Sequence, residues 1–177
     1  MKKENISTIQ KLTLSAMVMA LYVVILYFTQ SFSFGAYQIR IATSLYALSY
    51  LFPFLVFPLG LANFIANMLL GGLGLPDMVG GCIVGIVTTS FIVGIRKMNW
   101  NSNLMILPII LIPGLGVPVW LSYCLNAPYA PLAVSLCIGQ VIPAFVGAFL
   151  IKALERALGL NKRTLPIGGL EHERQKH

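Results

Sequence analysis

Residues 12–151 carry only four formally charged side chains, which are Arg40, Asp77, Arg96 and Lys97. A water-soluble stretch of this length needs many more, because about a quarter of the residues in soluble domains are charged. The solvent around this segment is therefore lipid. Since charged groups are costly inside a bilayer, Arg40 and Asp77 are the first candidates for a functional role.

Hydrophobic length sets the number of membrane crossings. A span needs about 20 apolar residues in a helix, so this segment has room for about six spans joined by short turns. Glycine, proline and polar clusters mark the breaks. The predicted spans lie near residues 10–29, 41–52, 54–71, 78–96, 104–125 and 130–157. Residues 41–70 are too many for one upright helix and few for two, so the prolines at 53 and 58 predict two short or tilted helices there.

Basic residues test this count. They precede the first span, follow the fourth and end or follow the sixth, at Lys2, Lys3, Lys11, Arg96, Lys97, Lys152, Arg156, Lys162, Arg163, Arg174 and Lys176. With an even number of spans between these groups, eleven of the twelve basic residues fall on one face, which the positive-inside rule makes cytoplasmic. The sequence predicts an all-α membrane protein, a six-transmembrane-helix bundle in the cell membrane, with cytoplasmic N and C termini.

The net charge of +7 is explained by this topology, because the basic residues flank apolar spans instead of lining a soluble face. We therefore expect the lipid bilayer, and no nucleic acid, as a partner. The first span is long enough for a retained helix rather than a cleaved signal. We expect one integral membrane domain over residues 1–160 and a polar cytoplasmic tail over residues 161–177.

Residue chemistry argues against an enzyme. The segment of spans offers one Asp, no Glu and no His, since His172 and His177 lie in the tail. No phosphate-binding Gly-rich loop followed by Lys is present, so any ATP hydrolysis belongs to another subunit. The cysteines at 82, 124 and 137 have no paired spacing and are interpreted as buried free thiols. We expect no metal and no cofactor.

Amides within the spans suggest a binding site. Asn63 and Asn67 are four residues apart, so they share one face of the third span, which leads to Asp77. The simpler interpretation is that each amide bonds a neighbouring helix and holds the bundle together, which is common in membrane proteins. The alternative that we favour is a hydrogen-bonding pocket for a flat polar heterocycle near the outer surface. Gln140 on the sixth span and Trp120 on the fifth are added as substrate-binding residues.

The first outer loop, residues 30–40, mixes aromatic rings, amides and a glycine. Such a loop suits a lid that stacks on a planar ligand and hinges away, with Tyr37, Gln38 and Arg40 as contacts. Two simpler interpretations stay open. The aromatics suit an interfacial belt, and Arg40 with Asp77 suits a salt bridge between the outer loops.

Ala16 and Ala20 place small side chains four residues apart on the first span, which allows another helix to approach closely. The same spacing occurs at Ala62 and Ala66 and at Gly81 and Gly85, so packing inside the bundle is the alternative.

Several features together resemble a known family. They are the six short spans, the Ala-x-x-x-Ala strip, the basic end of the last helix, Gln-Ile-Arg-Ile at residues 38–41, and Ala-Asn-Met-Leu-Leu-Gly-Gly-Leu-Gly-Leu-Pro-Asp-Met-Val-Gly-Gly at residues 66–81. They resemble the substrate-binding S component of an energy-coupling factor (ECF) transporter, and most of all the QueT-like queuosine-precursor family. The likeness covers roughly residues 8–160.

The resemblance implies an S component that binds a 7-deazaguanine or queuine-like base and docks on a transmembrane T component with two ATPase subunits. Ala16 and Ala20 match the strip that contacts the T component, residues 30–40 match the gating loop, and Asn67 and Asp77 match the outer pocket. Thr43 stands where an acidic residue is expected. The alternatives are an S component for another heterocyclic vitamin, or a small structural or assembly membrane protein without a ligand.

Overall fold

The computed structural model describes residues 7–33, 38–71 and 73–157, and these residues form helices without any strand. In chain order the elements are α1 (Thr8–Phe28), α2 (Gln30–Ser33), η1 (Ile41–Tyr50), η2 (Pro53–Leu55), α3 (Val56–Leu70), α4 (Leu75–Lys97), η3 (Ser102–Met105), α5 (Ile106–Leu125), α6 (Tyr129–Gly139) and α7 (Val141–Ala157). The η elements are 3₁₀ helices. The expected tail, residues 161–177, lies outside the described residues.

Five helical segments of the described chain are long and apolar enough to cross a membrane: Thr8–Phe28, Pro53–Leu70, Leu75–Lys97, Ser102–Leu125 and Tyr129–Ala157. They match the first, third, fourth, fifth and sixth predicted spans to within about three residues, the error expected of helix ends. The chain is a multi-pass helical membrane protein.

The second predicted span has a different form. Residues Ile41–Tyr50 make a ten-residue 3₁₀ helix, η1, in which every residue after Ile41 is buried. Runs of 3₁₀ helix longer than about four residues are uncommon. Two hydroxyl groups favour it here, because Thr43 and Ser49 each donate to the carbonyl oxygen three residues earlier, at 2.7 Å. η1 is therefore an interior element that packs against α7, α4 and α1.

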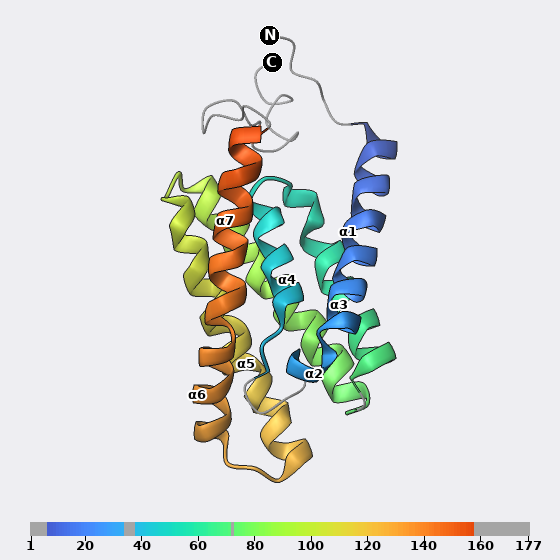
Figure 1. Ribbon diagram of the computed structural model, residues 1–177, viewed down its shortest axis with the longest axis vertical. Coiled ribbons are helices and arrows are strands. Elements are labelled where there is room, and N and C mark those ends of the chain that lie inside the picture. The colour runs from blue at the N-terminus through green and yellow to red at the C-terminus, as the bar shows by residue number, and fades with distance from the viewer. Residues whose placement is uncertain (1–6, 34–37, 72, 158–177) are drawn as a thin grey trace, which may run out of the picture.

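Helix directions define two ends of the bundle (Figure 1). The start of α1, the end of α4 and the end of α7 lie at one end, which we call the basic end because Lys11, Arg96, Lys97, Lys152 and Arg156 are there. The end of α5 lies at the opposite end, and the start of η1, the end of α3 and the start of α4 face that end from nearer the middle of the bundle.

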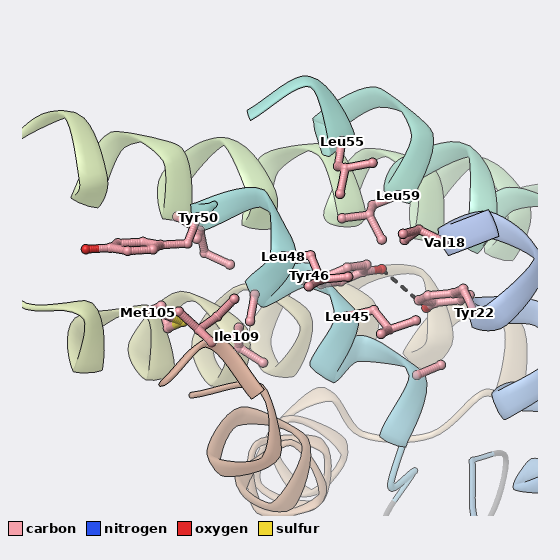
Figure 2. Packing of buried hydrophobic residues seen from close by; sticks show 14 of the residues in the cluster. Val18, Tyr22, Leu45, Tyr46, Leu48, Tyr50, Leu55, Leu59, Met105 and Ile109 are labelled. Carbon is pink, nitrogen blue, oxygen red and sulfur yellow. Dashed lines mark hydrogen bonds between the residues drawn. The ribbon is translucent and has the colours of Figure 1, made fainter. Parts of the chain in front are cut away.

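The largest core cluster surrounds η1 (Figure 2). Tyr46 from η1 and Tyr22 from α1 are both fully buried, and Leu55 from η2 and Leu59 from α3 pack beside them. At about 25 cal/mol for each Å² removed from water, burying such rings and aliphatic chains is the main stabilising contribution in a soluble core. Lipid is itself apolar, so close packing carries more of that role here.

Two helix boundaries differ from the prediction in ways that affect the polar residues. Asp77 was expected in the loop before the fourth span, but α4 begins at Leu75 and Asp77 lies in its first turn, where a helix dipole favours an acidic side chain. The last predicted span is divided into α6 and α7, and Gln140 lies at the junction.

Arg96 also has a role that the topology argument missed. It lies in the last turn of α4, is 8% exposed, and Nη1 donates to the carbonyl oxygens of Tyr50 and Leu51 at 2.7 and 2.8 Å. These carbonyls end η1 and have no helical donor of their own. Arg96 therefore caps η1 at the basic end.

Candidate functional site

Arg40 stands at the start of η1 and bonds to α3. Its Nη1 donates to Asn63 Oδ1 at 3.3 Å, and its Nη2 donates to Asn67 Oδ1 at 3.0 Å. Asn63 and Asn67 share one face of α3, as their spacing predicted. A single guanidinium therefore bonds to two amides about one turn of the helix apart and holds both in place.

The same two amides join α3 to α4. Asn63 Nδ2 donates to the Gly81 carbonyl oxygen at 2.9 Å and to the Tyr46 hydroxyl at 2.8 Å, and Asn67 Nδ2 donates to the Asp77 carbonyl oxygen at 2.9 Å. A Cβ at position 81 would lie 2.5 Å from Asn67 Nδ2, so glycine is needed for this approach. The Gly81 and Gly85 spacing thus serves helix packing, the alternative given above.

Asp77 is the acidic member of the group. It is 3% exposed, and its Oδ1 accepts a hydrogen bond from the indole Nε1 of Trp120 at 3.2 Å. Its Oδ2 is buried and has no hydrogen-bond partner among the residues that the structure describes. A carboxylate oxygen in that state costs free energy, because it has left water without gaining a donor.

Glycines leave room for the aromatic and acidic side chains. A Cβ at Gly80 would lie 2.8 Å from the Trp120 ring, and a Cβ at Gly71 would lie 3.0 Å from Asp77 Oδ2. The indole therefore lies directly on the backbone of α4, one turn after Asp77. We call Arg40, Tyr46, Asn63, Asn67, Asp77 and Trp120 the buried polar cluster.

Thr43 and Gln140 are connected to this cluster by hydrogen bonds that begin at Arg40. Thr43 hydrogen-bonds both the Arg40 carbonyl oxygen at 2.7 Å and Gln140 Oε1 at 2.8 Å, and Gln140 is buried at the α6–α7 junction. Interrupted helices often supply polar groups to binding sites within membranes. Thr43, which stands in place of an expected acid, therefore ties the start of η1 to this junction.

The chemistry of the cluster is mixed. It combines one cation, one carboxylate with an unused oxygen, two amides, a phenol and an indole, all in the half of the bundle away from the basic end. Such a set matches a small polar molecule that both donates and accepts hydrogen bonds, because few polar groups in a largely apolar wall fix orientation.

The structure brings some of the predicted site residues together and leaves others apart. Arg40, Asn63, Asn67, Asp77 and Trp120 meet in one network, and Gln140 joins it through Thr43. Gln38 is partly exposed and has a positive φ of 42°, whereas Tyr37 lies outside the described residues.

Ala16 and Ala20 lie away from the network. Both are exposed on α1, which is the least buried of the five spans.

Sequence reasoning missed Tyr46. Its ring suits an apolar core, and its hydroxyl group reaches Asn63 only because η1 runs beside α3. A tyrosine six residues after a membrane-embedded arginine was the available signal, and it is a weak one.

A family model described as the QueT transporter matches residues 12–156. The chain belongs to the QueT transporter family. No curated protein and no solved structure matches it. The match confirms the family inferred from the sequence motifs and covers every described span from Leu12 onward.

Membership of the QueT family fixes the broad class. This is a transporter family, which agrees with a multi-pass membrane chain and with the interpretation that the protein is not an enzyme. The roles of the individual residues remain predictions, and the buried polar cluster is where the structure concentrates the predicted ones.

Proposed function

We propose that this QueT-family chain is the substrate-binding (S) subunit of an ECF-type importer and that it binds a queuosine precursor, a 7-deazaguanine or queuine-like base. The observation that carries the proposal is Asp77 Oδ2, a buried carboxylate oxygen without a hydrogen-bond partner in the described chain. Leaving such a group unpaired costs about 1–3 kcal/mol, and a ligand that donates to it recovers that cost.

A guanine-like edge suits this carboxylate. Its ring N–H and exocyclic amine point in the same direction, so they match the two oxygens of one carboxylate, and such charge-assisted bonds are about twice as strong as neutral ones. Trp120 already donates to Oδ1. That oxygen keeps a second lone pair, so the two donors are compatible.

The remaining cluster supplies the opposite polarity. Arg40 places a positive charge beside the amides of Asn63 and Asn67, which suits the carbonyl oxygen of such a base. In this proposal residues 30–40 form the loop that closes over the bound base, and Gln38 and Tyr37 belong to it.

Topology and partners complete the proposal. The positive-inside rule places the basic end in the cytoplasm, so the buried polar cluster lies toward the outside, where the base enters. Ala16 and Ala20, exposed on α1, form the strip that docks on the T component. Two ATPase subunits supply the energy that reorients the whole bundle.

Extraction of the bound molecule tests the ligand. The purified chain is denatured, and the released small molecules are identified by mass spectrometry, with the Asp77→Asn variant as a matched control. We expect a 7-deazaguanine-type mass from the wild type and much less from the variant. Another heterocycle would support a vitamin S component instead, and an empty wild-type protein that also fails to bind added 7-deazaguanine would contradict the proposal.

A further inference from the structure

A line of hydrogen bonds leads from the buried polar cluster to α1. Asn63 accepts from Arg40 and donates to the Tyr46 hydroxyl, and the Tyr46 hydroxyl lies 3.4 Å from the Tyr22 hydroxyl. Figure 2 shows the Tyr22–Tyr46 contact, and the two rings are stacked with their centroids 5.9 Å apart. Three elements, α3, η1 and α1, are thereby connected through side chains.

This pair of hydroxyl groups is not explained by packing alone. Both tyrosines are fully buried. The pair has two hydroxyl protons, but only one hydrogen bond joins the two hydroxyl groups. The Tyr46 oxygen already accepts from Asn63, so one proton has no acceptor among the described residues. Two phenylalanines would fill the same space without that cost.

Neighbouring backbone holds the Tyr46 hydroxyl in place. A Cβ at position 85 would lie 3.1 Å from the Tyr46 oxygen and 3.1 Å from Gly60 Cα, so α3, α4 and this hydroxyl meet where only glycine fits. The hydroxyl and the Gly81 carbonyl oxygen are the two acceptors of Asn63 Nδ2. Together they fix the plane of the amide, and Oδ1 then points at Arg40.

We propose that Tyr46 is a positioning residue for the binding site, acting through Asn63 on Arg40, and that Tyr22 extends this restraint to α1. The inference rests on the proposed function in one respect, that the cluster binds a 7-deazaguanine-type base. Without the Tyr46 hydroxyl group, Asn63 keeps one acceptor and its amide tilts, so Arg40 is presented to the base in the wrong place. α1 also carries the exposed Ala16 and Ala20, so the restraint joins the site to the proposed docking helix.

Equilibrium binding of 7-deazaguanine to the purified chain tests this. One neutral hydrogen bond corresponds to about a two- to tenfold change in affinity. We expect Tyr46→Phe to weaken binding about tenfold and Tyr22→Phe about threefold, on that basis.

Tyr50→Phe on η1 and Tyr27→Phe on α1 are matched controls, because neither hydroxyl group forms a hydrogen bond in the described chain. Figure 2 shows Tyr50 pointing away from Tyr46. Both controls should bind like the wild type.

A double-mutant cycle separates positioning from general destabilisation. If Tyr46 acts through Asn63, Tyr46→Phe produces no further loss, within about twofold, in an Asn63→Ala background. An equal loss in both backgrounds would overturn the proposed route, and wild-type affinity in Tyr46→Phe would overturn the role itself.

A ligand-free cycle keeps this inference distinct from the proposed function. If the wild type fails to bind 7-deazaguanine, the proposed ligand is wrong, but the route can still be measured by thermal unfolding. The destabilisation by Tyr46→Phe should then depend on whether Arg40 is present or replaced in Arg40→Met, whereas that by Tyr50→Phe should not. Additive effects of Tyr46→Phe and Arg40→Met would overturn the positioning role.

Discussion

Two buried arginines stand at the two ends of η1, and they are held in different ways. Arg96 is 8% exposed and donates to two backbone carbonyl oxygens at the end of the helix. Arg40 is 6% exposed and donates to two side-chain amide oxygens from α3. Arg96 therefore bonds to backbone groups, which every sequence with this fold has. Arg40 bonds to side chains, which a substitution can remove without altering the backbone.

Helix electrostatics sharpen this contrast. The last carbonyls of a helix lack internal donors and carry partial negative charge, so Arg96 is at the end that favours a cation. Arg40 precedes the first turn of η1, and the partial positive charge at that end of a helix disfavours a cation. A residue that opposes its local preference usually marks a functional site, whereas one that agrees with it serves architecture.

The largest effect on transport is expected away from both ends of η1, on α1. Ala16→Trp with Ala20→Trp should reduce uptake in cells to background and leave 7-deazaguanine affinity within about twofold, because bulky rings prevent close approach of a T-component helix without reaching the cluster. The control is Leu21→Trp, an exposed position on another face of α1.

Two outcomes would refute that separation. Normal uptake and complex assembly in the double variant would make the strip a lipid-facing surface only. Loss of ligand binding together with uptake would place this face of α1 inside the functional core.

At the cluster end, Arg40→Lys should weaken 7-deazaguanine binding by about 10–100-fold, since a lysine keeps the charge but cannot bridge both amides. Its thermal unfolding temperature should change less than that of the corresponding Arg96 variant. Isothermal titration and a melting curve on the same preparation measure both quantities. A variant that melts early and binds normally would reverse the comparison.

At the basic end, Arg96→Lys should destabilise the protein by about 1–3 kcal/mol, because the shorter side chain does not bring its ammonium group to both carbonyl oxygens and one of them loses its donor. Affinity per folded molecule should stay within about twofold, because the substitution is at the far end of η1. Lys97→Arg, at an exposed neighbouring position, is the control for changing a basic side chain there. A large loss of affinity at full stability would mean that Arg96 serves the binding site.

The smallest effect is expected at Trp120. Trp120→Phe retains an aromatic ring against Gly80 but loses the indole N–H that bonds Asp77, so 7-deazaguanine affinity should fall about two- to tenfold. Trp100→Phe, at a half-exposed ring beyond α4, should have no effect. Tighter binding in the Trp120 variant would mean that the indole competes with the ligand for the carboxylate.

Much of the fold was predictable because membranes impose simple rules. Five of the six predicted spans match apolar helices of the structure, since hydrophobic length and helix breakers fix their ends. η1 was not predictable as a 3₁₀ helix, because a run of small, hydroxyl-bearing and apolar residues shows no period that separates it from an α-helix. The backbone of residues Ile41–Tyr50 reveals it, and the hydroxyl bonds of Thr43 and Ser49 to the carbonyls three residues earlier agree with it.

The site residues that are rare in membrane spans could be predicted from the sequence, and the contacts between common residues could not. Arg40 and Asp77 were conspicuous as charges in an apolar segment, and Asn63 with Asn67 followed from spacing. Whether Asp77 meets Trp120, and whether Tyr46 meets Asn63, depends on how helices far apart in the chain pack together. Arg96 was assigned to topology alone, because nothing local distinguishes a basic flank from a helix cap.

The central claim is that the Asp77 carboxylate receives the ligand, and the affinity of Asp77→Asn for 7-deazaguanine tests it most directly. The variant keeps the shape and an oxygen for Trp120 but replaces the unpartnered acceptor with a donor. The account predicts an affinity about 10–100-fold below that of the wild type, at an unchanged melting temperature before ligand is added. Wild-type affinity in the folded variant would contradict it.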